Sequence, residues 1–275
     1  MLFTKLAFAG LVGLVAGQET FEEVIDGYRF IKSGPKELKP KEEYELEFAR
    51  YTLDLLKTRI GADGLIKLLQ PDIEEANAFW HDVIDTKATG GDWVPTDGRA
   101  VGFFPNLTAY SFAAWSQSPF ADRANNAANP EHYVKRTEQI EPGVLESEIL
   151  EGWGGVTTHF SVLNYATPPD RTRHPMLREL PEFPFQAAGD KVLRDGSEDG
   201  VFGVLHISAR DVPGEEYGEE HDGVDIYATV WYPSGVEDEH IEVERQHITV
   251  EILNQAVQAQ KDIASGEFVP PPMPE

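Results

Sequence analysis

The sequence predicts an α+β fold in which N-terminal helices precede a curved antiparallel sheet and a long C-terminal helix. Apolar residues recur at helical spacing between residues 41 and 85, β-branched and aromatic runs dominate residues 154–233, and residues 234–262 have the length and end signals of a helix. A sheet wrapped around a long helix is the helix-grip arrangement, and a cone-shaped sheet behind N-terminal helices is the other arrangement that this order allows. Both enclose a cavity for a small apolar molecule.

The first 17 residues have the pattern of a secretory signal peptide. Lys5 precedes an apolar run at residues 6–15, and small residues follow it. A run of about a dozen residues is too short to span a bilayer, which needs about 20. We therefore expect a secreted or lumenal protein whose mature chain starts near Gln18. The sequon at Asn106 then predicts an N-glycosylated protein.

Beyond the signal peptide, residues 18–87 are expected to form a helical segment. Tyr44, Phe48 and Tyr51 have helical spacing within residues 41–60, and Pro71 suits the first turn of a second helix at residues 71–85. Residues 88–266 are expected to form the α+β cavity domain, packed with the helical segment as one compact unit. A Pro-rich tail, residues 267–275, should lie extended.

Within the cavity domain, Gly, Pro, Asn and aromatic residues at 88–129 predict short strands and loops. Residues 154–166 form a predicted strand that glycines and prolines bound. Residues 201–212 and 223–233 predict two antiparallel strands joined by an acidic loop. Both faces of the run at 201–212 are apolar, so this strand is expected inside the sheet, covered on both sides.

The last element is predicted as a helix from about residue 234 to residue 262 or beyond. Ser234 suits the N-cap, acidic residues 237–239 suit the positive end of the helix dipole, and Gly266 suits its end. Short stretches of strand-like alternation compete, but the length and the capping signals favour a helix.

Composition excludes several function classes. The 275 residues contain 48 acidic and 23 basic side chains, a formal charge of −25, which disfavours nucleic acid and anionic membranes as partners. The absence of cysteine excludes thiol nucleophiles and thiolate metal sites. No serine-hydrolase, nucleotide-binding or dinucleotide-binding motif is present.

One face of the predicted C-terminal helix carries a row of polar side chains. At 100° per residue, four groups with acid–base or metal-binding chemistry fall on one line. They are His240, Glu244, His247 and Glu251. The opposite side of the helix is also polar, so one of the two sides is a candidate to face a cavity while the other faces water. The ordinary solvated-face interpretation remains open at this point.

Other candidate site residues lie on predicted strands. A histidine in a strand either satisfies its nitrogens in the core or lines a pocket, where its pKa suits proton transfer. His159 and His206 are the two such histidines. Asp225, Tyr227 and Trp231 share one face of the strand before the helix and are candidates to bind substrate.

These observations favour a secretory-pathway enzyme of small-molecule metabolism that acts on a small apolar organic molecule. His247 and Glu251 would form the acid–base pair, with His159 or His206 as a second proton carrier, for an isomerase, cyclase, lyase or hydrolase reaction. No cofactor is needed. In the alternative metal-dependent hydrolase, a divalent ion would be held by residues from the set His247, Glu251, His240 and Glu244. A third hypothesis is a secreted ligand-binding or interaction protein without catalysis.

Overall fold

A computed structural model describes residues 19–88, 92–141, 144–197 and 200–273. The signal peptide predicted at residues 1–17 lies outside the described residues. The chain divides into two compact units between Leu53 and Asp54, that is, inside helix α1 (Lys41–Ile60), whereas the sequence analysis placed a boundary after residue 87. Within the described residues, no helix is both long and apolar enough to cross a membrane.

The first unit contains a β-hairpin that the sequence analysis did not predict. Strands β1 (Thr20–Ile25) and β2 (Tyr28–Ser33) pair antiparallel, and helix α1 begins after them. Asp26 and Gly27 both have positive φ angles, of 51° and 81°, which is the backbone that a two-residue Asp-Gly hairpin turn requires.

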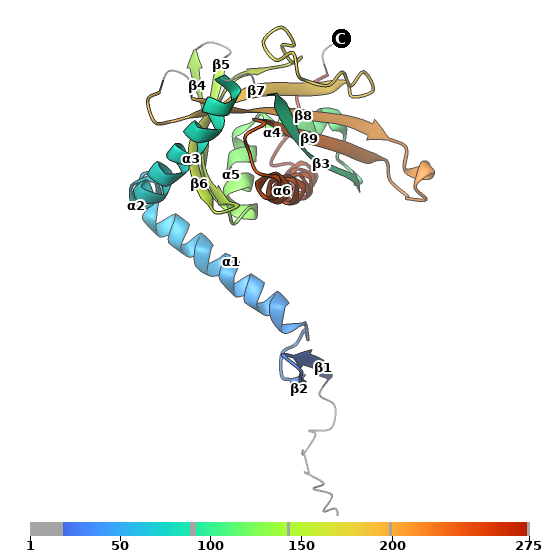
Figure 1. The fold of residues 1–275 in the computed structure, drawn as a ribbon. Helices are drawn as coiled ribbons and strands as arrows, with labels where there is room; N and C mark the ends of the chain where they lie inside the picture. Colours follow the sequence, from blue (N-terminus) through green and yellow to red (C-terminus); the bar gives the residue numbers. More distant parts are fainter. Residues whose placement is uncertain (1–18, 89–91, 142–143, 198–199, 274–275) are drawn as a thin grey trace, which may run out of the picture. The chain divides into compact units, whose positions relative to one another are not determined.

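The second unit is built on a seven-stranded antiparallel sheet whose order is β3-β9-β8-β7-β6-β5-β4 (Figure 1). The strands are β3 (Trp93–Phe103), β4 (His132–Glu141), β5 (Val144–Trp153), β6 (Val156–Ala166), β7 (Phe185–Leu193), β8 (Val201–Val212) and β9 (Gly223–Pro233). The helices are α2 (Ala62–Leu68), α3 (Gln70–Ala88), α4 (Ala109–Ser116), α5 (Pro119–Ala128) and α6 (Asp238–Ser265), and a short 3₁₀ turn is η1 (Gly214–Glu216).

The order of these elements is that of a helix-grip fold, as the sequence predicts. Strand β3 leads into α4 and α5, strands β4 to β9 then follow as a meander, and β9 returns to pair with β3. The sheet curves around α6, which contacts β3, β5, β9 and α5 (Figure 1). The N-terminal helix α3 packs on the same sheet through contacts with β6, β8 and β9.

Close approach of α6 to the sheet depends on a glycine in β3. A Cβ atom at Gly98 would lie 2.5 Å from Ile248 Cγ2 and 3.1 Å from the backbone nitrogen of Thr249. Any larger residue would force the helix or the strand to move. Gly98 thereby allows α6 to lie close to β3. The candidate site occupies the space between this helix and the sheet.

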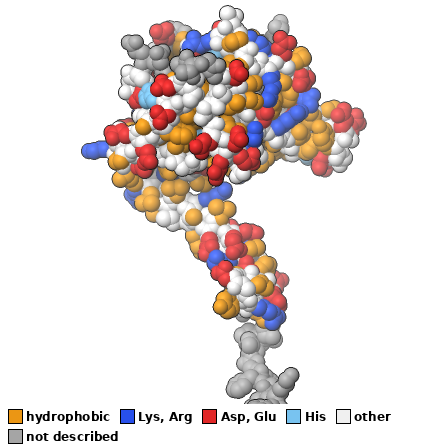
Figure 2. All heavy atoms as spheres, in the orientation of Figure 1, with side chains coloured by type: hydrophobic (Ala, Val, Ile, Leu, Met, Phe, Trp, Pro, Cys, Tyr) orange, Lys and Arg blue, Asp and Glu red, His pale blue; other side chains and the backbone are white. Residues whose placement is uncertain are grey.

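The core fills the space between the concave face of the sheet and the helices. Its largest fully buried members come from α3, α4, β6, β8 and β9, and they are Trp80, Phe112, Trp115, Phe160, Phe202 and Tyr232. Most of the acidic side chains stay outside this core, and Figure 2 shows them scattered over the face in view. The buried carboxylates described below are therefore exceptions that require partners.

Several predicted elements are confirmed and others are wrong. Helices at 41–60 and 71–85 are present as α1 and α3, the strand at 154–166 is β6, and the interior hairpin is β8 and β9. The C-terminal helix begins later than predicted, because Ser234 lies in the turn after β9 and donates its N–H to the Asp92 carbonyl. Its N-cap is Glu237.

Residues 88–129 are more regular than the sequence analysis expected. They contain the 11-residue strand β3 and two helices in place of short strands and loops. Thr108 and Ser111 form a capping box that starts α4, and Pro119 occupies the first turn of α5. Gly98 lies inside β3 and Pro119 starts α5, so the Gly, Pro and Asn content of this stretch does not indicate loops.

Candidate functional site

A cavity of about 110 Å³ lies between the concave face of the sheet and α6. One water needs about 10–15 Å³ by the same kind of measure, so the cavity is large enough for more than a single water. Its walls are mostly apolar, with Phe112, Ile149, Phe160, Val162, Leu205, Ile207, Ile226, Ala228, Val230, Ile248 and Ile252. One part of the wall is polar and includes His132, Glu151, Lys191, Glu244, His247 and Glu251.

The polar line of α6 faces inward. His247 and Glu251 both line the cavity, and Glu244 is only 1% exposed. The solvated-face interpretation is therefore wrong for these three residues. His240, at the start of the line, lies apart from them in an aromatic cluster with Phe79 and Trp153, at ring-centroid distances of 5.2 and 4.7 Å.

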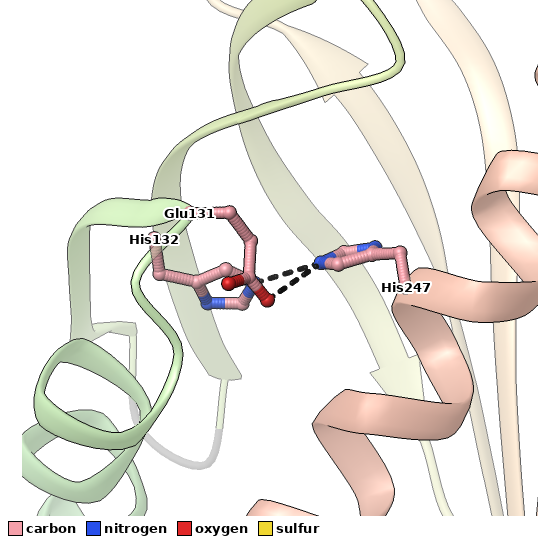
Figure 3. A group of neighbouring side chains, drawn as sticks. All are labelled: Glu131, His132 and His247. Carbon is pink, nitrogen blue, oxygen red and sulfur yellow. Dashed lines mark hydrogen bonds and ion pairs between the residues drawn. The ribbon is translucent and has the colours of Figure 1, made fainter. Parts of the chain in front are cut away.

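His247 is held from both sides of its ring. Its Nδ1 lies 3.0 Å from Glu244 Oε2, and Trp153 stacks on the ring at a centroid distance of 5.2 Å and an angle of 20°. Its Nε2 points across the gap to the start of β4, where it lies 3.3 Å from His132 Nε2 and 3.4 Å from Oε1 of the preceding residue, Glu131 (Figure 3). Nδ1 therefore serves to orient the ring, while Nε2 is the nitrogen that reaches the site.

The two histidines have opposite electrostatic surroundings. Burial favours the neutral form of His132 and lowers its pKa, although the carboxylates of Glu251 and Glu151 oppose that effect. Burial alone would also lower the pKa of His247. The carboxylates of Glu131 and Glu244, which contact the two ring nitrogens, outweigh it and raise that pKa to about 11. Because the two Nε2 atoms lie 3.3 Å apart, one proton fits between them, and it belongs mainly to His247.

A buried ammonium group supports the carboxylates of this site. Lys191 Nζ lies 3.4 Å from Glu151 Oε1 and 4.0 Å from Glu244 Oε1. Burial alone would raise the pKa of Glu151, but the charge of Lys191 and those of the two histidines lower it to about 2. Burial, helped by Glu244, raises the pKa of Tyr232, whose hydroxyl donates to Glu244 Oε1 at 2.9 Å.

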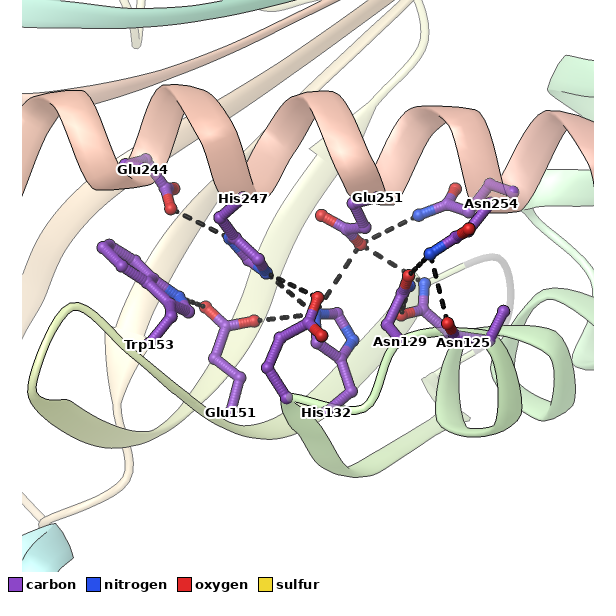
Figure 4. Close-up of polar contacts among 12 residues, drawn as sticks. Asn125, Asn129, His132, Glu151, Trp153, Glu244, His247, Glu251 and Asn254 are labelled. Atoms are coloured by element: carbon purple, nitrogen blue, oxygen red, sulfur yellow. Dashed lines mark hydrogen bonds and ion pairs between the residues drawn. The ribbon is translucent and has the colours of Figure 1, made fainter. Parts of the chain in front are cut away.

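Glu251 is held by amide groups that also lock α5 to α6 (Figure 4). Its Oε1 accepts hydrogen bonds from Gln255 at 2.8 Å and from Asn125 at 3.4 Å. Asn129 joins the same network, because its Oδ1 accepts from Asn254 Nδ2 at 2.7 Å. The Glu251 side chain is 23% exposed, so it keeps contact with the cavity and with water.

Three of these groups are placed to hold a cation. Glu131, His132 and His247 each offer a ligand atom, and these atoms all lie within 4.8 Å of one another. The metal set expected from the sequence was different. Glu244 contacts the far nitrogen of His247, Glu251 Oε1 is 3.9 Å from His132 Nε2, and His240 lies among aromatic rings.

His159 and His206 do not face His247, contrary to the sequence-based expectation. Both lie on the outer face of the sheet, because their neighbours Phe160, Leu205 and Ile207 line the cavity. His159 pairs with Glu148 at 2.8 Å. Burial and the charges of Arg171 and Arg178 lower the pKa of His206 to about 4.

The expected substrate-binding residues also lie on the outer face. Asp225, Tyr227 and Trp231 alternate along β9 with Ile226, Ala228 and Val230, which line the cavity. Asp225 is fully buried between Arg99 and Arg210, which it contacts at 2.6 and 2.8 Å. The sequence correctly predicts that these three residues share one face of the strand, but that face does not line the cavity.

Reasoning from the sequence missed Glu131, His132, Glu151, Lys191 and Tyr232. A signal existed for Glu151, because Ile149 and Trp153 stand two residues away on either side, so the carboxylate shares an apolar strand face. His132 gave no such signal, since its place opposite His247 depends on how β4 and α6 meet in space. The sequon residue Asn106 lies on the surface.

No family model matches this chain, and no curated protein matches its sequence. Among solved structures, the Zhui aromatase/cyclase from Streptomyces sp. R1128 is similar over 65% of this chain and 100% of its own, at 10% identity and a TM-score of 0.39. A norcoclaurine synthase point mutant from Thalictrum flavum is similar over 64% of this chain and 99% of its own, at 12% identity and a TM-score of 0.37. Ara h 8.0201 is similar over 62% of this chain and 99% of its own, at 10% identity and a TM-score of 0.35. At these scores the likeness carries no argument about function.

Proposed function

We propose that the protein is an enzyme that moves protons on a small, largely apolar organic molecule held between the sheet and α6. The observation that carries this proposal is that His247 and Glu251 line the same cavity as the apolar side chains of the concave face. Apolar walls with a few convergent polar groups are typical of small-molecule sites. The secretory-pathway setting remains a proposal that rests on the sequence of the first 17 residues.

The reaction class that fits is proton removal from a carbon next to a carbonyl group. Glu251 would take the proton, the C–H electron pair would become a carbon–carbon double bond, and the carbonyl π pair would move onto oxygen. An electrophile at His247 Nε2 would stabilise the charge that develops on that oxygen. Isomerisation, cyclisation and elimination share this first step, and they differ in where the proton or leaving group goes next.

Glu244 and Lys191 are positioning residues in this account. Glu244 fixes the His247 ring through Nδ1, and Tyr232 fixes Glu244 in turn. Lys191 balances part of the negative charge of the buried carboxylates, and it has no direct part in the proposed proton transfer. Their substitution should therefore weaken the orientation of His247 more than it changes which molecules enter the cavity.

The first test asks whether the cavity accepts an apolar molecule. We expect 2-naphthol to bind the protein with a change in its fluorescence, and we expect Ala228→Phe to weaken that binding at least about tenfold by filling the cavity. Tyr227→Phe is the matched control, because it alters the neighbouring residue on the other face of β9. Equal binding by both variants would contradict the proposed site, provided that circular dichroism shows both to be folded.

The second test separates an enzyme from a carrier. With 1-tetralone in D₂O, proton NMR follows loss of the hydrogens next to the carbonyl. We expect the protein to accelerate this exchange and Glu251→Gln to reduce the acceleration about 10²–10⁴-fold. His206→Gln, a change on the outer face, should keep it. Binding of 1-tetralone without faster exchange would favour the carrier hypothesis.

A further inference from the structure

The geometry points to a divalent metal site formed by Glu131, His132 and His247, of the class that binds zinc. These side chains come from two separate parts of the chain, the start of β4 with the residue before it and the middle of α6, and they converge on one point (Figure 3). The role of the ion rests on the function proposed above, whereas its binding rests on the arrangement of the ligands.

Two spacings between the ligand atoms match those of a tetrahedral centre, and all three atoms lie within 4.8 Å of one another. Bonds of about 2.0–2.1 Å place neighbouring ligand atoms of such a centre about 3.3 Å apart. The two histidine Nε2 atoms are 3.3 Å apart, and His247 Nε2 is 3.4 Å from Glu131 Oε1. Glu151 Oε2 lies 3.3 Å from His132 Nε2, so a second carboxylate borders the same point.

The neighbours of His247 prepare it to bind a cation. A carboxylate cannot donate, so the contact between Glu244 Oε2 and His247 Nδ1 requires the proton on Nδ1. A metal ion would displace the proton on Nε2 and take the lone pair that points at Glu131 and His132. A metal-bound histidine that donates its other N–H to a carboxylate is a recurrent arrangement, and Tyr232 holds Glu244 in turn.

Unsatisfied polar atoms also point to a missing partner. Glu131 Oε1 is buried, and its contact among the described residues is the approach of His247 Nε2 at 3.4 Å, which lacks hydrogen-bond geometry. His132 is 1% exposed, and its Nε2 lies 3.3 Å from His247 Nε2, 3.3 Å from Glu151 Oε2 and 3.9 Å from Glu251 Oε1. Buried polar atoms of this kind are rare unless something satisfies them, and a cation between them would do so.

The charge balance favours a cation as well. Four carboxylates surround the two histidines, and they are Glu131, Glu151, Glu244 and Glu251. In the part of the chain that the structure describes, Lys191 is the only residue besides the histidines that forms an ion pair with any of them. Metal ligation requires both rings to be neutral, which leaves three negative charges, and a divalent ion would reduce them to one.

The donor set selects the kind of ion. Two imidazoles with carboxylates suit zinc and its first-row neighbours, while magnesium and calcium prefer sites made of oxygen. His132 and His247 line the cavity, so a molecule bound there would lie next to an ion that they hold. There the ion would be the electrophile that the proposed reaction needs, acting on a substrate oxygen.

The test uses the full chain after treatment with a chelator. Isothermal titration with Zn²⁺ alone should show one equivalent bound, and Co²⁺ should give the visible absorption of a tetrahedral site. We expect Glu131→Gln, His132→Asn and His247→Asn each to weaken binding at least about 100-fold. Glu131 is partly exposed, so Glu131→Gln remains informative if a buried histidine variant fails to fold.

Two controls exclude unspecific binding. His206→Gln removes a buried histidine of the outer face, and His221→Ala removes an exposed histidine of the acidic loop. Both should bind Zn²⁺ like the original chain.

Substoichiometric binding, or equal affinity in the three ligand variants, would overturn the inference. If 2-naphthol binding and 1-tetralone exchange persist without metal, the proposed function stands and the catalytic role of the ion fails. If Zn²⁺ binds but neither of them occurs, the proposed function fails instead.

Discussion

Lys191 supplies the positive charge that two buried carboxylates share. It is 5% exposed, contacts Glu151 and Glu244, and lies 4.5 Å from the centre of the Phe160 ring. We predict that Lys191→Met lowers the free energy of unfolding by about 3–5 kcal/mol, because it leaves buried charges without their partner.

Urea unfolding at constant m-value measures this loss. The exposed Lys67→Met is the control and should change the free energy of unfolding by about 0.5 kcal/mol at most. A loss below about 1 kcal/mol for Lys191→Met would mean that Glu151 and Glu244 are neutral or reach water.

His206 provides a test of the outer face. Burial, Arg171 and Arg178 lower its pKa to about 4, while the unfolded chain has the ordinary value near 6.5. As the pH falls from 6.5 to 4, the unfolded state takes up a proton that the folded state refuses, so stability falls across that window and not above it.

We predict that His206→Gln reduces this acid-dependent loss by about 3 kcal/mol between pH 7 and pH 4. Urea unfolding at a series of pH values measures it. The exposed His221→Gln serves as the comparison and should keep the pH dependence of the original chain. Parallel curves for His206→Gln and the original chain would show that His206 is already accessible to protons.

At the scale of single residues, helical spacing predicted part of the candidate site. It aligned Glu244, His247 and Glu251, and the structure turns all three inward. It gave no information on His132, because a contact between residues 115 positions apart depends on how elements pack. His206 was misplaced for a different reason. Strand alternation shows which residues share a face, but not which face is concave.

Helix α6 determines the depth of the cavity, and Gly98 determines how closely it approaches β3. We predict that Gly98→Ala destabilises the protein by about 1–3 kcal/mol, since the added Cβ would lie 2.5 Å from Ile248 Cγ2. Ile248→Ala removes that atom, so the double variant should lose less stability than the sum of the two single variants. A double-mutant cycle by urea unfolding measures the coupling, and strictly additive losses would contradict the close contact.

The elements differ in how much of them the sequence reveals. Strands β6, β8 and β9 are predictable because they are rich in β-branched and aromatic residues. Strands β4 and β5 carry charged residues at many positions, and β7 contains Ala, Gly and Asp, so their composition hides them. The edge strand β4 and its neighbour nevertheless provide His132 and Glu151.

At the scale of the whole molecule, the predicted signal peptide and secretion can be tested directly. We predict that the full chain, expressed in a eukaryotic secretory host, appears in the medium with an N-terminus near Gln18. We also predict a glycan on Asn106, which is exposed. Asn106→Gln should run faster on a gel, as should the glycosidase-treated protein. Retention in the cytosol with an intact N-terminus would contradict this prediction.

The fold class was predictable as a whole because it depends on the order of helices and strands, whereas the site depends on where distant segments meet.

The central claim is that the space between the sheet and α6 binds a small apolar molecule beside His247 and Glu251. The most direct measurement is the electron density of crystals soaked with 2-naphthol. The account predicts the ring between Leu205, Ala228 and α6, with its hydroxyl toward His247. Density for the ring on the outer face instead, or side chains that fill the cavity, would contradict it.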